Sequence, residues 1–307
     1  MHEGSKKAII AAFFANLGIA ISKFVGFVIT GSAGLLAEAG HSLADTGNQA
    51  LLLFGSKRGN RKADHAHPFG YGPERYFWAF VVALVLFSMG GLFALYEGIA
   101  KVRDPHEIDR VGVALGILFF AILLEGFSLT TAVKEANRIR DRSASWWSYI
   151  RSAKSPELPV VLLEDIGAET GLVLALGGLI MAEVTGDARW DAIGSISIGI
   201  LLVCIAMVLA VEMKGLLIGE SATDQVQDAI EASITTAPHV NGLIHIRSMH
   251  LGPDDLLVAA KVEFDQALTV PELSRAVDGV EVAMRASVPE AHLTIYLEPD
   301  IRRVVAE

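Results

Sequence analysis

The chain has 307 residues, of which 52% are hydrophobic, and its mean hydropathy is +0.46. That value is too high for an ordinary soluble domain, while 20% charged residues is too many for a protein that lies wholly in lipid, so we expect a membrane part joined to a soluble part. The formal net charge of -10 argues against a nucleic-acid partner, and the single cysteine, Cys204, excludes an intrachain disulfide and a thiolate-cluster metal site.

Six apolar stretches are long enough to cross a bilayer as helices, at a rise of about 1.5 Å per residue. The first follows a short charged start and is too long for the apolar core of a cleaved signal, so we interpret it as a retained helix. The predicted spans are Ile9–Thr30, Leu35–Ser56, Tyr76–Ala100, Val111–Val133, Leu158–Met181 and Ile193–Val211.

The loops between the spans differ in their basic charge. The loops 57–75 and 134–157 carry five and six Lys and Arg residues, whereas the loops on the opposite side carry three and one. Since basic loops stay on the cytoplasmic side, an even number of spans places both termini there. We therefore expect a multi-pass protein of the cell (inner) membrane, with cytoplasmic N- and C-termini.

From residue 216 onward the sequence has the pattern of a small acidic domain, with fifteen acidic against six basic residues. Helical periodicity and strand alternation follow one another in the order α-β-β-α-β. The predicted domains are 1–215, with six transmembrane helices, and 216–307, which is cytoplasmic. The fold class is thus a membrane α-helical protein with a small cytoplasmic α+β domain.

Two of the spans carry clusters of ionisable side chains, one of them in the second span and the other in the fifth. Such groups are costly in lipid, so they tend to face a partner or a wet cavity and to mark a substrate path. An imidazole together with several carboxylates is a ligand set for a divalent transition metal. The candidate metal ligands are His41, Asp45, Asp165, Glu164 and Glu169.

Two further charged residues stand inside other spans. Lys23, near the far end of the first span, either reaches the membrane interface or makes a contact between helices. Glu125, in the fourth span, is expected to contact the fifth helix or to line an access path.

With these features the chain resembles the cation diffusion facilitator family. The likeness covers essentially the whole chain and rests on the six spans, the His-x-x-x-Asp of His41 and Asp45, the acid-bearing fifth span and the α-β-β-α-β tail. The segment HPFGYGPER before the third span is similar to the family's His-x-Phe-Gly-x-Gly signature. The resemblance implies a homodimeric exporter, not an enzyme, that exchanges a divalent metal for protons, with a tail domain for dimerisation and regulation.

The fifth span departs from the usual family pattern. Val161 stands where most members have a histidine, and the adjacent Glu164-Asp165 pair resembles a minority branch of the family. We therefore rank Glu164 ahead of Glu169 as the fourth ligand, and leave both open.

Two accessory metal sites of some family members are also only partly matched. One lies in the loop before the third span and the other in the tail, and in each a different residue replaces an expected ligand. The matching residues are Asp64 and His67 in the loop, where Tyr71 replaces a histidine, and His245 and Glu298 in the tail, where Lys261 and Tyr296 replace others.

Zinc (Zn²⁺) is the favoured cargo because His41 is retained, although a carboxylate in place of an imidazole shifts preference toward Mn²⁺ or Fe²⁺, and Co²⁺ stays open. An exporter of one of these other metals, or a metal-sensing membrane protein that does not transport, is the alternative. The sequence has no HExxH motif for a metallohydrolase and no phosphate-binding loop for ATP.

Overall fold

The computed structural model describes residues 3–30, 33–104, 111–140, 142–143 and 145–301. Its contacts divide the chain into two compact units. The first consists of Met1–Arg58 and Glu74–Lys214, and the second of Gly59–Pro73 and Gly215–Glu307. The loop Gly59–Pro73 therefore groups with the C-terminal unit, whereas the sequence prediction assigned it to the domain 1–215.

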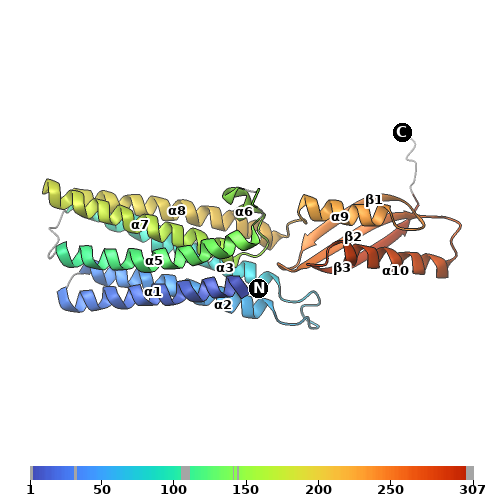
Figure 1. The fold of residues 1–307 in the computed structure, drawn as a ribbon, viewed down its shortest axis with the longest axis horizontal. Helices are drawn as coiled ribbons and strands as arrows, with labels where there is room; N and C mark the ends of the chain where they lie inside the picture. The colour runs from blue at the N-terminus through green and yellow to red at the C-terminus, as the bar shows by residue number, and fades with distance from the viewer. Residues whose placement is uncertain (1–2, 31–32, 105–110, 141, 144, 302–307) are drawn as a thin grey trace. The chain divides into compact units, whose positions relative to one another are not determined.

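The first unit is a bundle of long helices (Figure 1). Apolar segments of this kind form helices because a helix satisfies every backbone N–H and C=O within the segment. The long helical segments are α1 (Glu3–Thr30), α2 (Ala33–Gly59), the continuous run α3 (Pro73–Val85), η1 (Leu86–Leu92) and α4 (Phe93–Arg103), then α5 (Val111–Ile139), α7 (Glu157–Thr185) and α8 (Arg189–Ile218). Between α5 and α7 the basic segment forms a short helix, α6 (Trp146–Ser152).

Four helices of the described part are long and apolar enough to cross a membrane. The qualifying segments are Ile9–Gly26, Pro73–Arg103, Val111–Ile139 and Arg189–Ile218. The helices α2 and α7, which carry the ionisable clusters, are not among them. The structure thus supports a transmembrane unit and four of the predicted spans, and the crossing of α2 and α7 stays a prediction.

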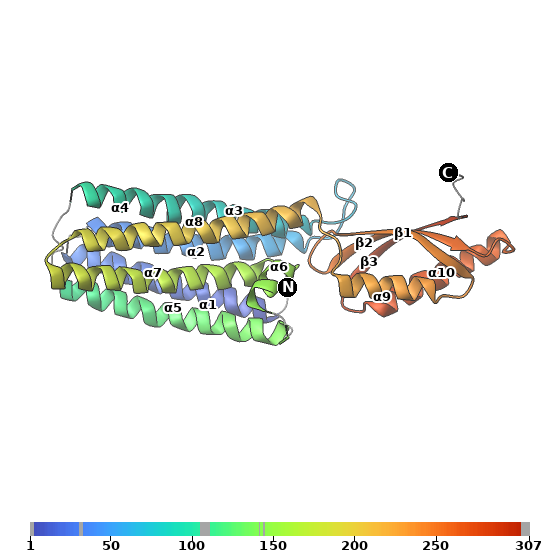
Figure 2. The ribbon, with the colours of Figure 1, turned by 90° about the horizontal axis from the view of Figure 1, so that it is seen from above.

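Close approach of α8 to its neighbours depends on glycine. A side-chain carbon added at Gly199 of α8 would lie 2.8 Å from the backbone nitrogen of Leu95 in α4, and one at Gly178 of α7 would lie 2.9 Å from the carbonyl oxygen of Trp190 in α8. Figure 2 shows α8 alongside α7 and α4. On the other side of the bundle, α1, α5 and α7 pack against one another. This packing holds α7 inside the unit.

A buried ion pair fastens the start of α3 to the start of α7. Arg75 Nε lies 2.6 Å from Glu157 Oε1, and both side chains are 2% exposed. Ser155 completes the group, since its hydroxyl donates to Glu157 Oε2 at 2.8 Å and accepts from Arg75 Nη2 at 3.2 Å. Two chain segments that are 82 residues apart are thereby held together.

Removing one partner of this pair should leave the other charge buried and uncompensated. We expect Glu157→Gln or Arg75→Met to lower the stability of the detergent-solubilised protein by about 3–5 kcal/mol, and the double variant Arg75→Met/Glu157→Leu to recover most of it. The measurement is thermal unfolding. The exposed pair of Arg285 and Glu281 provides the control, because Glu281→Gln should cost no more than about 1 kcal/mol. A double variant as unstable as the singles would contradict the expectation.

The C-terminal unit confirms the predicted α-β-β-α-β order. Its sheet has the strand order β1-β2-β3, with β1 antiparallel to β2 and β2 parallel to β3. Both helices cover one face of this sheet (Figure 1), and their buried side chains join those of β2 in one core. The elements are α9 (Asp224–Thr235), β1 (Val240–His250), β2 (Asp255–Phe264), α10 (Val270–Ser287) and β3 (His292–Asp300).

Candidate metal centre

The first half of the candidate site is on α2. The helix is continuous through His41 and Asp45, which are one turn apart. Asp45 is buried. The side chain of His41 lies outside the described part of the structure, so its role as a ligand stays a prediction.

The second half is on α7, where Glu164 and Asp165 are both buried. Asp165 Oδ2 accepts a hydrogen bond of 2.8 Å from the hydroxyl of Ser128 in α5. Burial of an ionisable pair between apolar helices is costly, and hydrogen bonds to the carboxylates offset that cost.

Glu164 joins the two halves directly. Asn48 Nδ2 donates to Glu164 Oε1 at 2.8 Å, and Gln49 Nε2 donates to Glu164 Oε2 at 2.5 Å. Each carboxylate oxygen thus receives one amide of α2, which leaves further lone pairs on both oxygens. The two helices that carry the predicted ligands are therefore in contact, and Glu164 accepts hydrogen bonds that link them.

The charges of the acids act on one another across three helices. Asp45 interacts electrostatically with Glu164, Asp165 and Glu125. Glu125, in α5, is buried, and its Oε2 accepts no hydrogen bond from any described residue. The acid that the sequence placed in the fourth span thus belongs to the same region as the two halves of the site.

Glu169 is half-buried on α7, one turn beyond Asp165. Its charge acts on that of Glu125, and its buried Oε2 is without a hydrogen bond in the described structure. Among the described side chains, no three His, Cys, Asp or Glu residues are grouped tightly enough to hold a metal ion. The described acids share a region, and by themselves they do not form a closed cage.

Three polar neighbours complete this region. The amides of Asn48 and Gln49 and the hydroxyl of Ser128 are not among the ligands predicted from the sequence. All three are polar side chains in otherwise apolar stretches, which is the signal that could have drawn attention to them.

The predicted accessory site in the loop is closed by a hydrogen bond. Tyr71 donates its hydroxyl to Asp64 Oδ2 at 2.6 Å, and Asp64 Oδ1 accepts from the backbone N–H groups of Ala66 and His67. These hydrogen bonds, that of Tyr71 foremost, hold the pKa of the Asp64 carboxyl below its usual value. Tyr71, which replaces the expected histidine, is therefore hydrogen-bonded to the Asp64 carboxylate that would bind a metal.

In the accessory site of the tail, a lysine forms salt bridges with two acidic side chains. Lys261 Nζ lies 2.7 Å from Asp300 Oδ2 and 3.0 Å from Glu298 Oε1, while His245 stands opposite Lys261 across the β1–β2 ladder. Hydrogen bonds to Asp300 and Glu298 raise the pKa of the Lys261 ammonium above its ordinary value. The ammonium of Lys261 thus neutralises the charges of Glu298 and Asp300.

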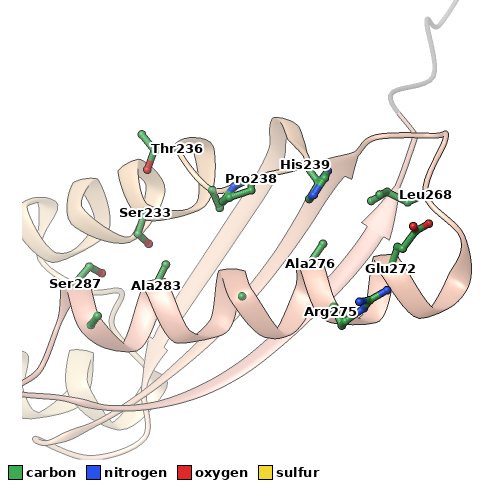
Figure 3. A pocket seen from close by; sticks show the side chains of 13 residues that line it. Ser233, Thr236, Pro238, His239, Leu268, Glu272, Arg275, Ala276, Ala283 and Ser287 are labelled. Atoms are coloured by element: carbon green, nitrogen blue, oxygen red, sulfur yellow. The ribbon is translucent and has the colours of Figure 1, made fainter.

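A hollow of about 850 Å³ lies between α9 and α10 (Figure 3). It is lined mainly by small side chains, with His239, Glu272 and Arg275 at one end. One histidine and one acid beside an arginine are a poor ligand set for a metal cation. The helices α2 and α7, rather than this hollow, carry the candidate metal centre.

Both parts of the chain match protein-family models. Residues 9–218 match the cation efflux transmembrane domain, and residues 222–300 match the cation efflux protein, cytoplasmic domain. The chain belongs to the cation efflux family, the cation diffusion facilitators. This is a family of membrane transporters and not of enzymes.

Named relatives fall within the same family. The proton-coupled zinc antiporter SLC30A9, mitochondrial, of Xenopus laevis is 33% identical over 265 residues, which are 86% of this chain and 47% of that protein. Metal tolerance protein C4 of Arabidopsis thaliana is 28% identical over 267 residues (87% and 58%), and magnetosome protein MamB of Magnetospira sp. (strain QH-2) is 27% identical over 283 residues (90% and 89%). The chain spans about half the length of the zinc antiporter it matches.

Proposed function

We propose that this protein exports a divalent metal cation, Zn²⁺ foremost, in exchange for protons, through a site between α2 and α7. The observation that carries the proposal is the contact of these two helices through Glu164, with Asp45 and Asp165 buried beside it. Carboxylates held in this way inside an apolar bundle are suited to a cation that leaves its water shell. The name of the zinc antiporter relative supports both the metal and the counter-ion.

In this proposal His41, Asp45 and Asp165 form the core of the site, and Glu164 or Glu169 supplies the fourth ligand. The helices α2 and α7 cross the membrane with the other four, which gives six spans and two cytoplasmic termini. The domains are then 1–215 in the cell (inner) membrane and 216–307 in the cytoplasm. The match of the tail to the family's cytoplasmic domain supports this division, and we propose that the tail joins two copies in a homodimer.

Proton exchange follows from the chemistry of the ligands. A histidine or carboxylate must lose its proton to bind a metal, so metal binding releases protons and proton binding releases metal. An imidazole titrates at about pH 6.5 before any perturbation, which makes His41 the natural carrier. At neutral pH in the cytoplasm the site takes up metal, and on a more acidic far side it gives the metal up.

The test is transport by the purified full-length protein in sealed vesicles. With an acidic lumen and Zn²⁺ outside, we expect uptake several-fold faster than without a pH gradient, together with a rise of the lumenal pH as metal enters. An ionophore that collapses the gradient is the control, and Mn²⁺, Fe²⁺ and Co²⁺ in parallel decide the cargo. Flux that ignores the gradient and moves no protons would contradict antiport. Tight binding without any flux would favour a metal sensor.

A further inference from the structure

Two amide oxygens of α2 are buried beside Glu164 without a hydrogen-bond donor. Asn48 and Gln49 are 1% and 0% exposed, and their amide nitrogens donate to the two carboxylate oxygens of Glu164. Their oxygens, Asn48 Oδ1 and Gln49 Oε1, are buried and accept no hydrogen bond from any residue that the structure describes. A buried acceptor without a partner costs about 1–3 kcal/mol, so two consecutive ones call for an explanation.

The bonds to Glu164 also fix which atom of each amide is the oxygen. A carboxylate accepts hydrogen bonds from an NH₂ group, whereas an amide oxygen in the same place would repel it. In each planar amide the oxygen and the nitrogen are attached to the same carbon and point in different directions. The carbonyl oxygens of Asn48 and Gln49 are therefore directed away from the carboxylate that holds their nitrogens.

The two amides share a helical face with a predicted metal ligand. Asn48 and Gln49 follow Asp45 by three and four residues on the continuous helix α2, and all three side chains are buried. The acids that the structure describes do not close a cage by themselves. A divalent cation in this region therefore needs further donors, and carbonyl oxygens are suitable ligands for hard divalent cations such as Mn²⁺.

We propose that the side-chain carbonyl oxygens of Asn48 and Gln49 bind the transported cation and set which metal the site prefers. The inference rests on the proposed function. Each amide then has two tasks, since its nitrogen holds Glu164 and its oxygen binds the metal. The cation supplies the positive partner that both buried oxygens lack, and the oxygens add no further negative charge to the acids. Because they are hard, neutral ligands, they raise the affinity for Mn²⁺ relative to Zn²⁺.

The test is calorimetric titration of Zn²⁺ and Mn²⁺ into the full-length protein. Asn48→Leu and Gln49→Met remove the amide oxygens and keep the size of the side chains. We expect each variant to bind Mn²⁺ at least about tenfold more weakly and Zn²⁺ no more than about threefold more weakly. Gln227→Met is the matched control, because Gln227 of α9 also donates its amide to a carboxylate, that of Glu231 at 3.0 Å. It should change neither affinity.

Asn48→His tests the oxygen while the bond to Glu164 is kept. An imidazole N–H donates to the carboxylate, and the second ring nitrogen takes the place of the amide oxygen. Since imidazole suits Zn²⁺ better than Mn²⁺, this variant should retain Zn²⁺ binding and lose Mn²⁺ binding at least about tenfold. Size-exclusion chromatography establishes that each variant is folded.

The ratio of the two affinities separates a ligand from a residue that only supports Glu164. Loss of support weakens both metals alike in Asn48→Leu and Gln49→Met, and it leaves Asn48→His like the wild-type protein. That outcome, or a wild-type protein that binds Zn²⁺ and does not bind Mn²⁺, would overturn this inference alone. Failure of the wild-type protein to bind and move Zn²⁺, Mn²⁺, Fe²⁺ or Co²⁺ would overturn the proposed function, and the inference with it.

Discussion

Replacing Asp45 or Asp165 by asparagine is expected to reduce metal transport at least about a hundredfold, since even residues that only support a metal ligand contribute 10- to 100-fold to metal affinity. Each replacement keeps the shape of the side chain and removes its charge. An amide oxygen is a weaker ligand than a carboxylate, and the remaining acids then hold a divalent cation poorly. The measurement is uptake into vesicles, with size-exclusion chromatography to establish that the variants fold and assemble.

Asp191 provides the matched control for these variants. It lies at the start of α8, where it pairs with Lys101 at 3.4 Å, away from the acids of α2 and α7. Asp191→Asn should therefore transport at a rate close to that of the wild-type protein. Transport by either Asp45→Asn or Asp165→Asn at a similar rate would show that the site is elsewhere.

Glu164→Gln and Glu169→Gln are expected to differ strongly. A glutamine at 164 presents an NH₂ group where Asn48 and Gln49 both donate, so one buried donor loses its acceptor, at a cost of about 1–3 kcal/mol. We expect metal affinity to fall at least about tenfold as the charge is lost. Glu169 is half-buried and accepts no such pair of amides from the side chains that the structure describes, so Glu169→Gln should only slow transport a few-fold. Calorimetric titration and vesicle uptake measure the two effects.

A reciprocal exchange separates folding from metal binding at this contact. In the double variant Glu164→Gln/Gln49→Glu the amide of residue 164 donates to the new carboxylate on α2, which restores the hydrogen bonds and moves the charge. Stability should return while metal binding stays weak, because residue 164 no longer contributes a charge to the site from α7. Equal and mild effects of the two single replacements would mean that water or another helix completes the coordination shell.

The sequence by itself determined the class of the protein and pointed to the helices that carry the candidate site. Apolar length predicts membrane helices, and alternation predicts the strands of the tail, because both patterns are local and repeat within a few residues. The same local spacing placed His41 and Asp45 on one helical face and identified Asp165 and its neighbouring acids as costly groups that require a function. The short helix Trp146–Ser152 escaped prediction, because seven residues are too few for a periodic signal.

Only the tertiary structure decided which side chains meet. Glu164 is bonded to amides of α2 that are 115 and 116 residues distant, and Arg75 is paired with Glu157 across 82 residues. No local pattern encodes such pairs, because they depend on which helix faces which. The same holds for Lys23. The sequence left open whether its side chain reaches the membrane interface or makes a contact between helices, and its hydrogen bond to Ser42 shows the contact. The burial of a charge is a property of the neighbours that surround it, and those neighbours come from other helices.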